Sequence, residues 1–123
     1  MTTSAREWFY ETFLDLGGEL EDSLEEAVWS EDQVETVLSV LASFDSLNDL
    51  SSEMRVRINS TDLSESESAH ISQQKVHLAA VAGRCRERLS RDHSGWVERI
   101  RPLRLDAKER LDEELRRLLI SGV

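Results

Sequence analysis

Hydrophobic residues recur every three or four positions along most of the chain, which is the period of an amphipathic α-helix. The first stripe predicts a helix that ends at the Gly17-Gly18 pair, and its members are Ala5, Trp8, Phe9, Thr12, Phe13 and Leu16. A second, short helix is predicted by the stripe Leu20, Leu24, Ala27 and Val28. Ser30 and Gln33 have the spacing of a capping box, so a third helix is predicted to begin there and to continue to Asn48-Asp49.

The middle of the chain departs from this helical period. Met54, Val56 and Ile58 alternate with two arginines, and a period of two is compatible with a strand. Because no partner strand is visible elsewhere in the sequence, a helical turn or an extended connector is preferred for residues 54–58. Residues 59–68 read NSTDLSESES, and this polar, serine-rich composition predicts a flexible connector.

A long helix is predicted after the connector, beginning at the capping box formed by Asp62 and Glu65. Its apolar stripe is Ile71, Leu78, Ala82, Cys85 and Leu89. Residues 79–83 include three alanines and a glycine, and such small residues let a neighbouring helix approach closely, so this segment is predicted to be the centre of the bundle. Residues 92–95 are predicted to end the helix.

The last part of the chain is predicted to hold two helices. Pro102 disfavours helical geometry at Arg101, so the helix that starts near Trp96 is expected to be short or kinked. Asp106 and Glu109 then predict a final helix, whose stripe is Ala107, Leu111, Leu115 and Leu118. No internal repeat or domain linker is found. The pattern predicts an all-α fold, a compact helical bundle of about five to seven helical segments in a single domain spanning residues 1–123.

The composition predicts the cellular environment of the protein. With 123 residues and a single cysteine, Cys85, the chain can bury a core but cannot form an internal disulfide. No run of about 18 apolar residues is present, and the first residues lack the layout of a secretory signal, so a cytoplasmic protein without a membrane partner is expected.

Charge divides the chain into two unequal parts. Residues 1–70 carry 17 acidic residues against three arginines, a formal charge of −14, and residues 71–123 carry 12 basic against eight acidic residues, a charge of +4. The acidic candidates for protein binding are Glu19, Glu21, Asp22, Glu25, Glu26, Glu31 and Asp32. A basic pole is formed by Arg84, Arg86, Arg88, Arg91, Arg99, Arg101 and Arg104.

Three interpretations of this charge division are open. Acidic and basic helices can pack beside one another within the bundle, or one pole can meet another molecule, or the excess acid can reflect a high-salt habitat. Direct binding of nucleic acid by the whole surface is not expected because the overall charge is negative, although the arginine-rich C-terminal half is a local exception.

Three hydrophobic residues are candidates for a protein contact. Tyr10 and Leu14 point well away from Phe9 on the first helix, so the helix is either buried on two sides or contacts a partner there. Trp29 falls off the stripe of its predicted helix, and both an interface anchor and a cap on the edge of the core fit this position.

Candidate catalytic patterns are few. Glu67 and His70 have the carboxylate-imidazole spacing found in di-metal helical bundles, but such a centre needs a second motif of this kind and the chain has none. Phosphate loops, nucleophile elbows and paired cysteines are absent from the sequence, so no catalytic residue, cofactor or metal is expected. Cys85 lies on an apolar stripe and is predicted to be a buried, unreactive thiol.

The segment Arg88-Leu-Ser-Arg-Asp-His93 resembles the Arg-x(4 to 6)-His pattern of the HEPN superfamily of helical RNases. The resemblance covers six residues and implies metal-independent RNA cleavage with Arg88 and His93 in the site. The polar residue that commonly follows the arginine in that family is replaced here by Leu89.

The function predicted from the sequence is a non-catalytic protein-protein interaction module that associates with itself through charge-complementary and apolar helix faces. One alternative is an acidic inhibitor, antitoxin or immunity-type protein that covers a basic, nucleic-acid-binding surface of a target protein. The second alternative is the HEPN-like RNase. The expected partner is therefore a protein, either a second copy of the chain or a protein with a basic surface.

Overall fold

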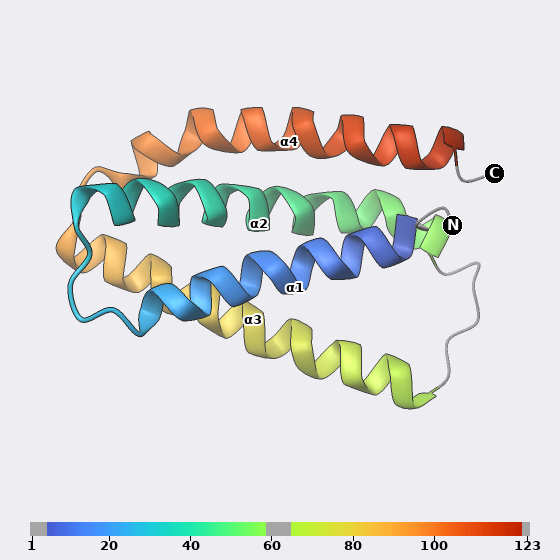
Figure 1. Cartoon of the computed structure of the whole chain (residues 1–123), viewed down its shortest axis with the longest axis horizontal. Coiled ribbons are helices and arrows are strands. Elements are labelled where there is room, and N and C mark those ends of the chain that lie inside the picture. The colour runs from blue at the N-terminus through green and yellow to red at the C-terminus, as the bar shows by residue number, and fades with distance from the viewer. Residues whose placement is uncertain (1–4, 59–64, 122–123) are drawn as a thin grey trace.

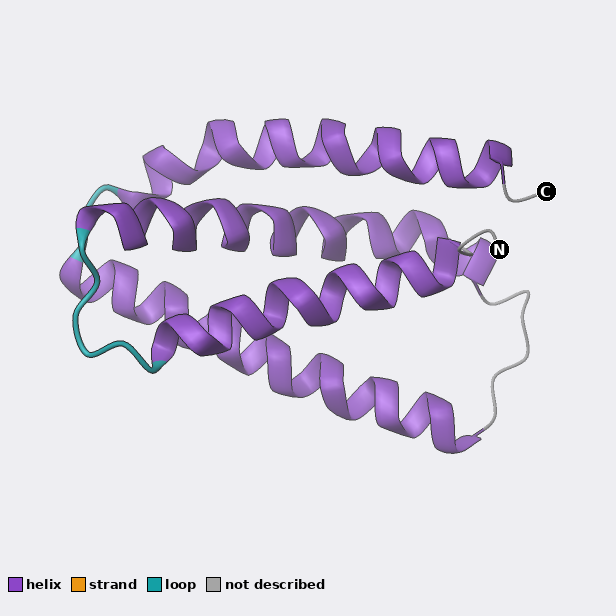
Figure 2. Ribbon diagram, viewed as in Figure 1, coloured by secondary structure: helices purple, strands orange, loops and turns teal. Residues whose placement is uncertain are grey.

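The computed structural model describes the backbone of residues 5–58 and 65–121, and the side chains of residues 7–50 and 70–118. The described backbone forms four helices and no strand (Figure 2). They are α1 (Ala5–Leu24), α2 (Glu31–Ile58), α3 (Glu65–Asp92) and α4 (Trp96–Ser121). The all-α prediction is confirmed.

The number of helices is lower than the predicted five to seven, because two expected breaks in the N-terminal half do not occur. α1 continues through Gly17-Gly18 to Leu24, so Leu20 belongs to α1 and no separate second helix exists between the first stripe and Ser30. α2 continues through Asn48-Asp49 to Ile58, and residues 54–58 are helical. Phe13 and Leu20 are buried on either side of Gly17-Gly18, and Leu47 and Leu50 are buried on either side of Asn48-Asp49. This burial offsets the weak helix propensity of the two pairs.

In the C-terminal half the predicted interruption at Pro102 is also wrong. α4 is continuous from Trp96 to Ser121, so Asp106 and Glu109 lie inside a helix and do not begin one. Of the predicted connector, residues 65–68 form the first turn of α3, and residues 59–64 lie outside the described part of the chain. The predicted break between α3 and α4 is confirmed at residues 93–95, where Gly95 has a φ of 89° that favours glycine.

α2 is the central helix of the bundle. It packs against both α1 and α4, while α3 packs mainly against α1 (Figure 1). Between Leu41 and Leu47 almost every side chain of α2 is buried, on all sides of the helix. The hydroxyls of two buried serines in this stretch have hydrogen-bond partners on α4. Ser46 Oγ donates to the carbonyl oxygen of Arg104 at 3.1 Å, and Ser43 Oγ accepts from Arg110 at 2.8 Å.

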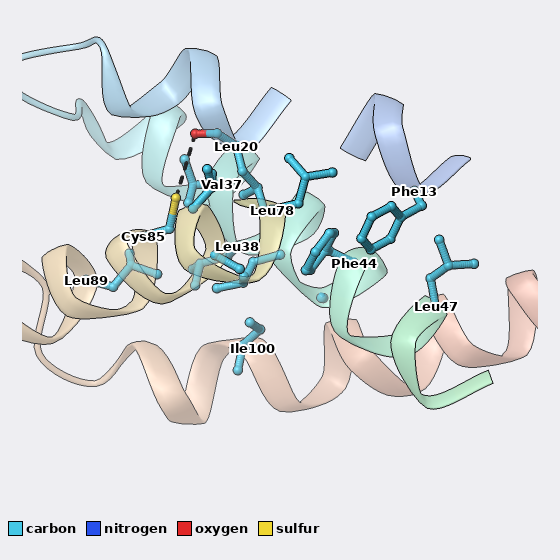
Figure 3. Close-up of a cluster of buried hydrophobic side chains, with 14 of the residues drawn as sticks. Phe13, Leu20, Val37, Leu38, Phe44, Leu47, Leu78, Cys85, Leu89 and Ile100 are labelled. Carbon is cyan, nitrogen blue, oxygen red and sulfur yellow. Dashed lines mark hydrogen bonds between the residues drawn. The ribbon is translucent and has the colours of Figure 1, made fainter. Parts of the chain in front are cut away.

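The sequence predicted that the alanine-rich segment of α3 is the centre of the bundle, and this prediction is wrong. Ala79 and Ala80 are exposed, and a Cβ added to Gly83 would meet no other atom within 4 Å. Leu78, Ala82, Cys85 and Leu89 form the buried stripe of α3, together with Val81. Figure 3 shows three of them, Leu78, Cys85 and Leu89, in one cluster with Leu20, Val37 and Leu38. Ala79 and Ala80 lie outside the stripe because their positions on the helix face solvent.

α3 leaves the bundle toward its N-terminal end. In Figure 1 the first turns of α3, coloured green to yellow, diverge from α1, and Leu78 is the first buried side chain among the described residues of this helix. Ile71, which the sequence placed in the stripe, is half-buried, and Val76 is 73% exposed. Among the described side chains of α3, those that belong to the core therefore lie in its C-terminal half, from Leu78 onward.

Candidate protein-binding surface

A continuous row of carboxylates covers the solvent face of α1 and the loop that follows it. We call this the acidic surface, and its members are Glu11, Asp15, Glu19, Asp22, Glu25 and Glu26. The four on α1 are spaced by four, four and three residues, which places them on one side of the helix. All six are exposed, and among the described residues none has an ion pair with a basic side chain.

The other acidic candidates have partners or a local role. Glu21 Oε2 lies 3.0 Å from His77 Nε2, which joins α1 to α3 where α3 leaves the bundle. Glu31 pairs with Arg99 of α4 at 2.9 Å. Glu31 and Asp32 occupy the first turn of α2, where a negative charge favours the positive end of the helix dipole. These three residues are therefore explained by the fold.

The basic pole is largely used inside the molecule. Five of its seven arginines form ion pairs, namely Arg86 and Arg104 with Asp45, Arg91 with Asp92, Arg99 with Glu31 and Arg101 with Glu98. A sixth, Arg88, lies over the ring of Trp29, with Cζ 4.1 Å from the ring centroid. Among the residues that the structure describes, Arg84 is the member of the pole with no ion pair or ring contact.

Asp45 of α2 joins three helices. Its side chain is 12% exposed, and its two oxygens accept from Arg86 of α3 and from Arg104 of α4, the latter at 2.5 Å. Asp45 is not among the residues predicted from the sequence. The available signal was that Leu38, Leu41 and Asp45 share one helix face, because a carboxylate on a buried face needs a basic partner.

Trp29 closes the loop end of the bundle. It is 4% exposed, its Nε1–H donates to the carbonyl oxygen of Ser23 at 2.8 Å, and its ring is covered by Arg88 and stacks at 6.5 Å on His93. Of the two positions that the sequence left open, the structure places Trp29 at the edge of the core. The HEPN-like pair Arg88 and His93 thus contacts the same aromatic ring, which gives both residues a structural role.

The apolar candidates on α1 separate into two kinds. Tyr10 is half-buried, packs against the core and meets the ring of Phe9 edge-on at 5.6 Å. Leu14 is 46% exposed and lies beside the acidic surface. Leu14 alone of the three predicted apolar contacts is thus exposed in the described structure.

Cys85 is buried, as predicted. Its Sγ lies 3.7 Å from the carbonyl oxygen of Leu20, the contact drawn as a dashed line in Figure 3. Burial raises the pKa of the thiol from 9.0 to about 11, although Arg88, Arg84 and Arg86 oppose the shift. A thiol with a raised pKa and no access to solvent is a poor nucleophile.

Three further findings bear on the kind of site. Among the described residues no three histidine, cysteine, aspartate or glutamate side chains gather in a way that could hold a metal ion. None of the described helices is long and apolar enough to cross a membrane. Comparisons of the chain with protein-family models, curated proteins and solved structures give no match.

Proposed function

We propose that this protein is a non-catalytic helical module that binds a protein with a basic surface through the acidic surface on α1 and its following loop. The observation that carries the proposal is the unequal use of charge. Most basic side chains of residues 71–123 have an ion pair, hydrogen bond or ring contact within the fold. The six carboxylates of the acidic surface, in contrast, face solvent with no ion pair among the described residues.

The same observation bears on the choice of partner. Self-association through opposite charges requires a free basic face on a second copy, and six of the seven arginines of the basic pole already have contacts. A different protein that supplies its own lysines and arginines is not limited in this way. The partner we propose is therefore of the kind covered by an inhibitor, antitoxin or immunity protein, and self-association stays a prediction for sedimentation to test.

Such a row of charge would mainly raise the rate at which the partner associates with the protein. Like charges on one face create a field that steers an oppositely charged protein toward it and raises the association rate, and the effect falls as salt screens the charges. The neutral apolar side chain of Leu14 beside the row would contribute contact area that salt does not weaken.

Capture from a lysate of the source cells, followed by binding of the purified captured protein, tests the proposal. The variant replaces Asp15, Glu19 and Asp22 with lysine, and its control replaces Glu87, Asp106 and Glu109, which are also exposed and unpaired in the described structure. Both variants change the net charge equally. We expect the first to lose a basic partner and the control to keep it, and equal loss from both would contradict the proposal.

A further inference from the structure

The loop of residues 25–30, between α1 and α2, is held to α1 and α3 by Trp29, and the first residue of α2 after it is held to α4. Trp29 donates to Ser23 of α1 and lies under Arg88 of α3, and Glu31 at the start of α2 pairs with Arg99 of α4. The loop is also closed locally, because the amide of Ser30 donates to Gln33 Oε1 at 3.1 Å and the amide of Gln33 donates to Ser30 Oγ at 3.2 Å. Figure 2 shows it, in teal, around the outside of one end of the bundle.

While Trp29 points into the core, the four residues before it all face solvent. Glu25, Glu26, Ala27 and Val28 are exposed, and Val28, at 79%, is the most exposed of the large hydrophobic side chains that the structure describes. A valine at this position contributes nothing to the core. It stands at the end of the acidic surface, next to two of its carboxylates, on a backbone held by the contacts of its neighbours.

We propose that Val28 is the apolar anchor of the acidic surface, and that the partner presents an apolar pocket bordered by lysine and arginine. The inference rests on the proposed function, because it names the contact that the basic partner makes. An interface buries an apolar centre within a polar rim, and a side chain on a fixed loop loses little conformational freedom when it is buried. The flanking carboxylates require basic groups on the partner's rim, since an unpaired buried charge is costly.

The experiment uses two synthetic peptides of equal length and charge as probes. One is a helix of roughly 18 residues with lysines on one face and leucines on the other, and in the second every leucine is replaced by glutamine. Binding to the full chain at physiological salt is followed by fluorescence anisotropy. We expect the leucine peptide to bind about tenfold more tightly, because burial of one valine side chain contributes on this order.

Val28→Ser is expected to remove that tenfold advantage and leave binding of the glutamine peptide unchanged. Val76→Ser is the matched control, because Val76 is 73% exposed on α3 and stands away from the loop. An unchanged circular dichroism spectrum shows that both variants fold. Equal affinities of the two peptides for the wild-type chain, or equal losses in the two variants, would overturn the role of Val28.

Failure of the proposed function has a different signature. If neither peptide binds, or if the lysine substitutions at Asp15, Glu19 and Asp22 leave binding of the glutamine peptide intact, the acidic surface itself is not a binding site. A dimer in sedimentation that Val28→Ser dissociates would assign Val28 to contact with a second copy and would also overturn the proposed partner.

Discussion

Gly17 of α1 faces the side chain of Leu78 of α3 so closely that a Cβ at position 17 would lie 2.5 Å from Leu78 Cδ1 and 2.9 Å from its Cγ. Leu78 is 3% exposed and is the first buried residue of α3 among those described. The space that a side chain at position 17 would occupy is thus filled by the first core side chain of α3, so α1 and α3 are in close contact here.

The two neighbouring glycines of α1 should respond oppositely to alanine. Gly17→Ala is expected to lower the free energy of unfolding by about 1 to 2 kcal/mol, because the overpacking of the new methyl group against Leu78 exceeds the gain from alanine's better helix propensity. Gly18→Ala is expected to raise it by about 0.5 to 1 kcal/mol, since no atom lies within 4 Å of its Cβ position and alanine favours the helix. Urea denaturation measures both, and a shift of the two midpoints in the same direction would show that the close contact does not control stability.

Removing the charge of Asp45 should destabilise the bundle. Asp45→Asn leaves Arg86 and Arg104 without their shared carboxylate, and we expect a loss of about 1 to 3 kcal/mol, moderated because both arginines are partly exposed. Asp49→Asn is the control, since Asp49 is exposed on the same helix and has no ion pair in the described structure. Equal urea midpoints for the two variants would mean that Asp45 does not hold the helices together.

The capping box of α2 gives a local prediction. Ser30→Ala removes the hydroxyl that accepts from the Gln33 amide, and the expected cost is about 1 kcal/mol. Ser39→Ala, at an exposed position inside α2, should be neutral or slightly stabilising because alanine is the better helix former. Thermal unfolding followed by circular dichroism compares them, and a Ser30→Ala variant as stable as Ser39→Ala would contradict a role for the cap.

The raised pKa of Cys85 predicts that the protein loses stability at alkaline pH. Its pKa is 9.0 unfolded and about 11 folded, so between these values the folded state holds a proton that the unfolded chain releases. The contribution is fully present below pH 9.0 and decreases as pH rises toward about 11, by about 2 to 3 kcal/mol in total. Cys85→Ala should unfold with a flatter dependence on pH in this window, and parallel curves for the two proteins would show that the thiol titrates normally.

The helical period of the sequence determined the fold class and much of the core. Phe9, Phe13, Val34, Leu38 and Leu89 are buried where their stripes placed them, and Ser30 caps a helix as its spacing to Gln33 predicted. These features depend on neighbours within a few turns of one helix, so local pattern is sufficient to find them.

The tertiary structure decided the helix ends and the use of the charges. Gly17 and Pro102 are weak points that favour a break in an isolated helix, and packing of the residues on either side of them keeps α1 and α4 continuous. Arg88 meets Trp29, and Arg86 and Arg104 meet Asp45, over at least 41 residues of separation, so no local pattern could pair them. These long-range contacts also decide which carboxylates remain exposed and unpaired, because the sequence alone does not show which acidic side chain each arginine binds.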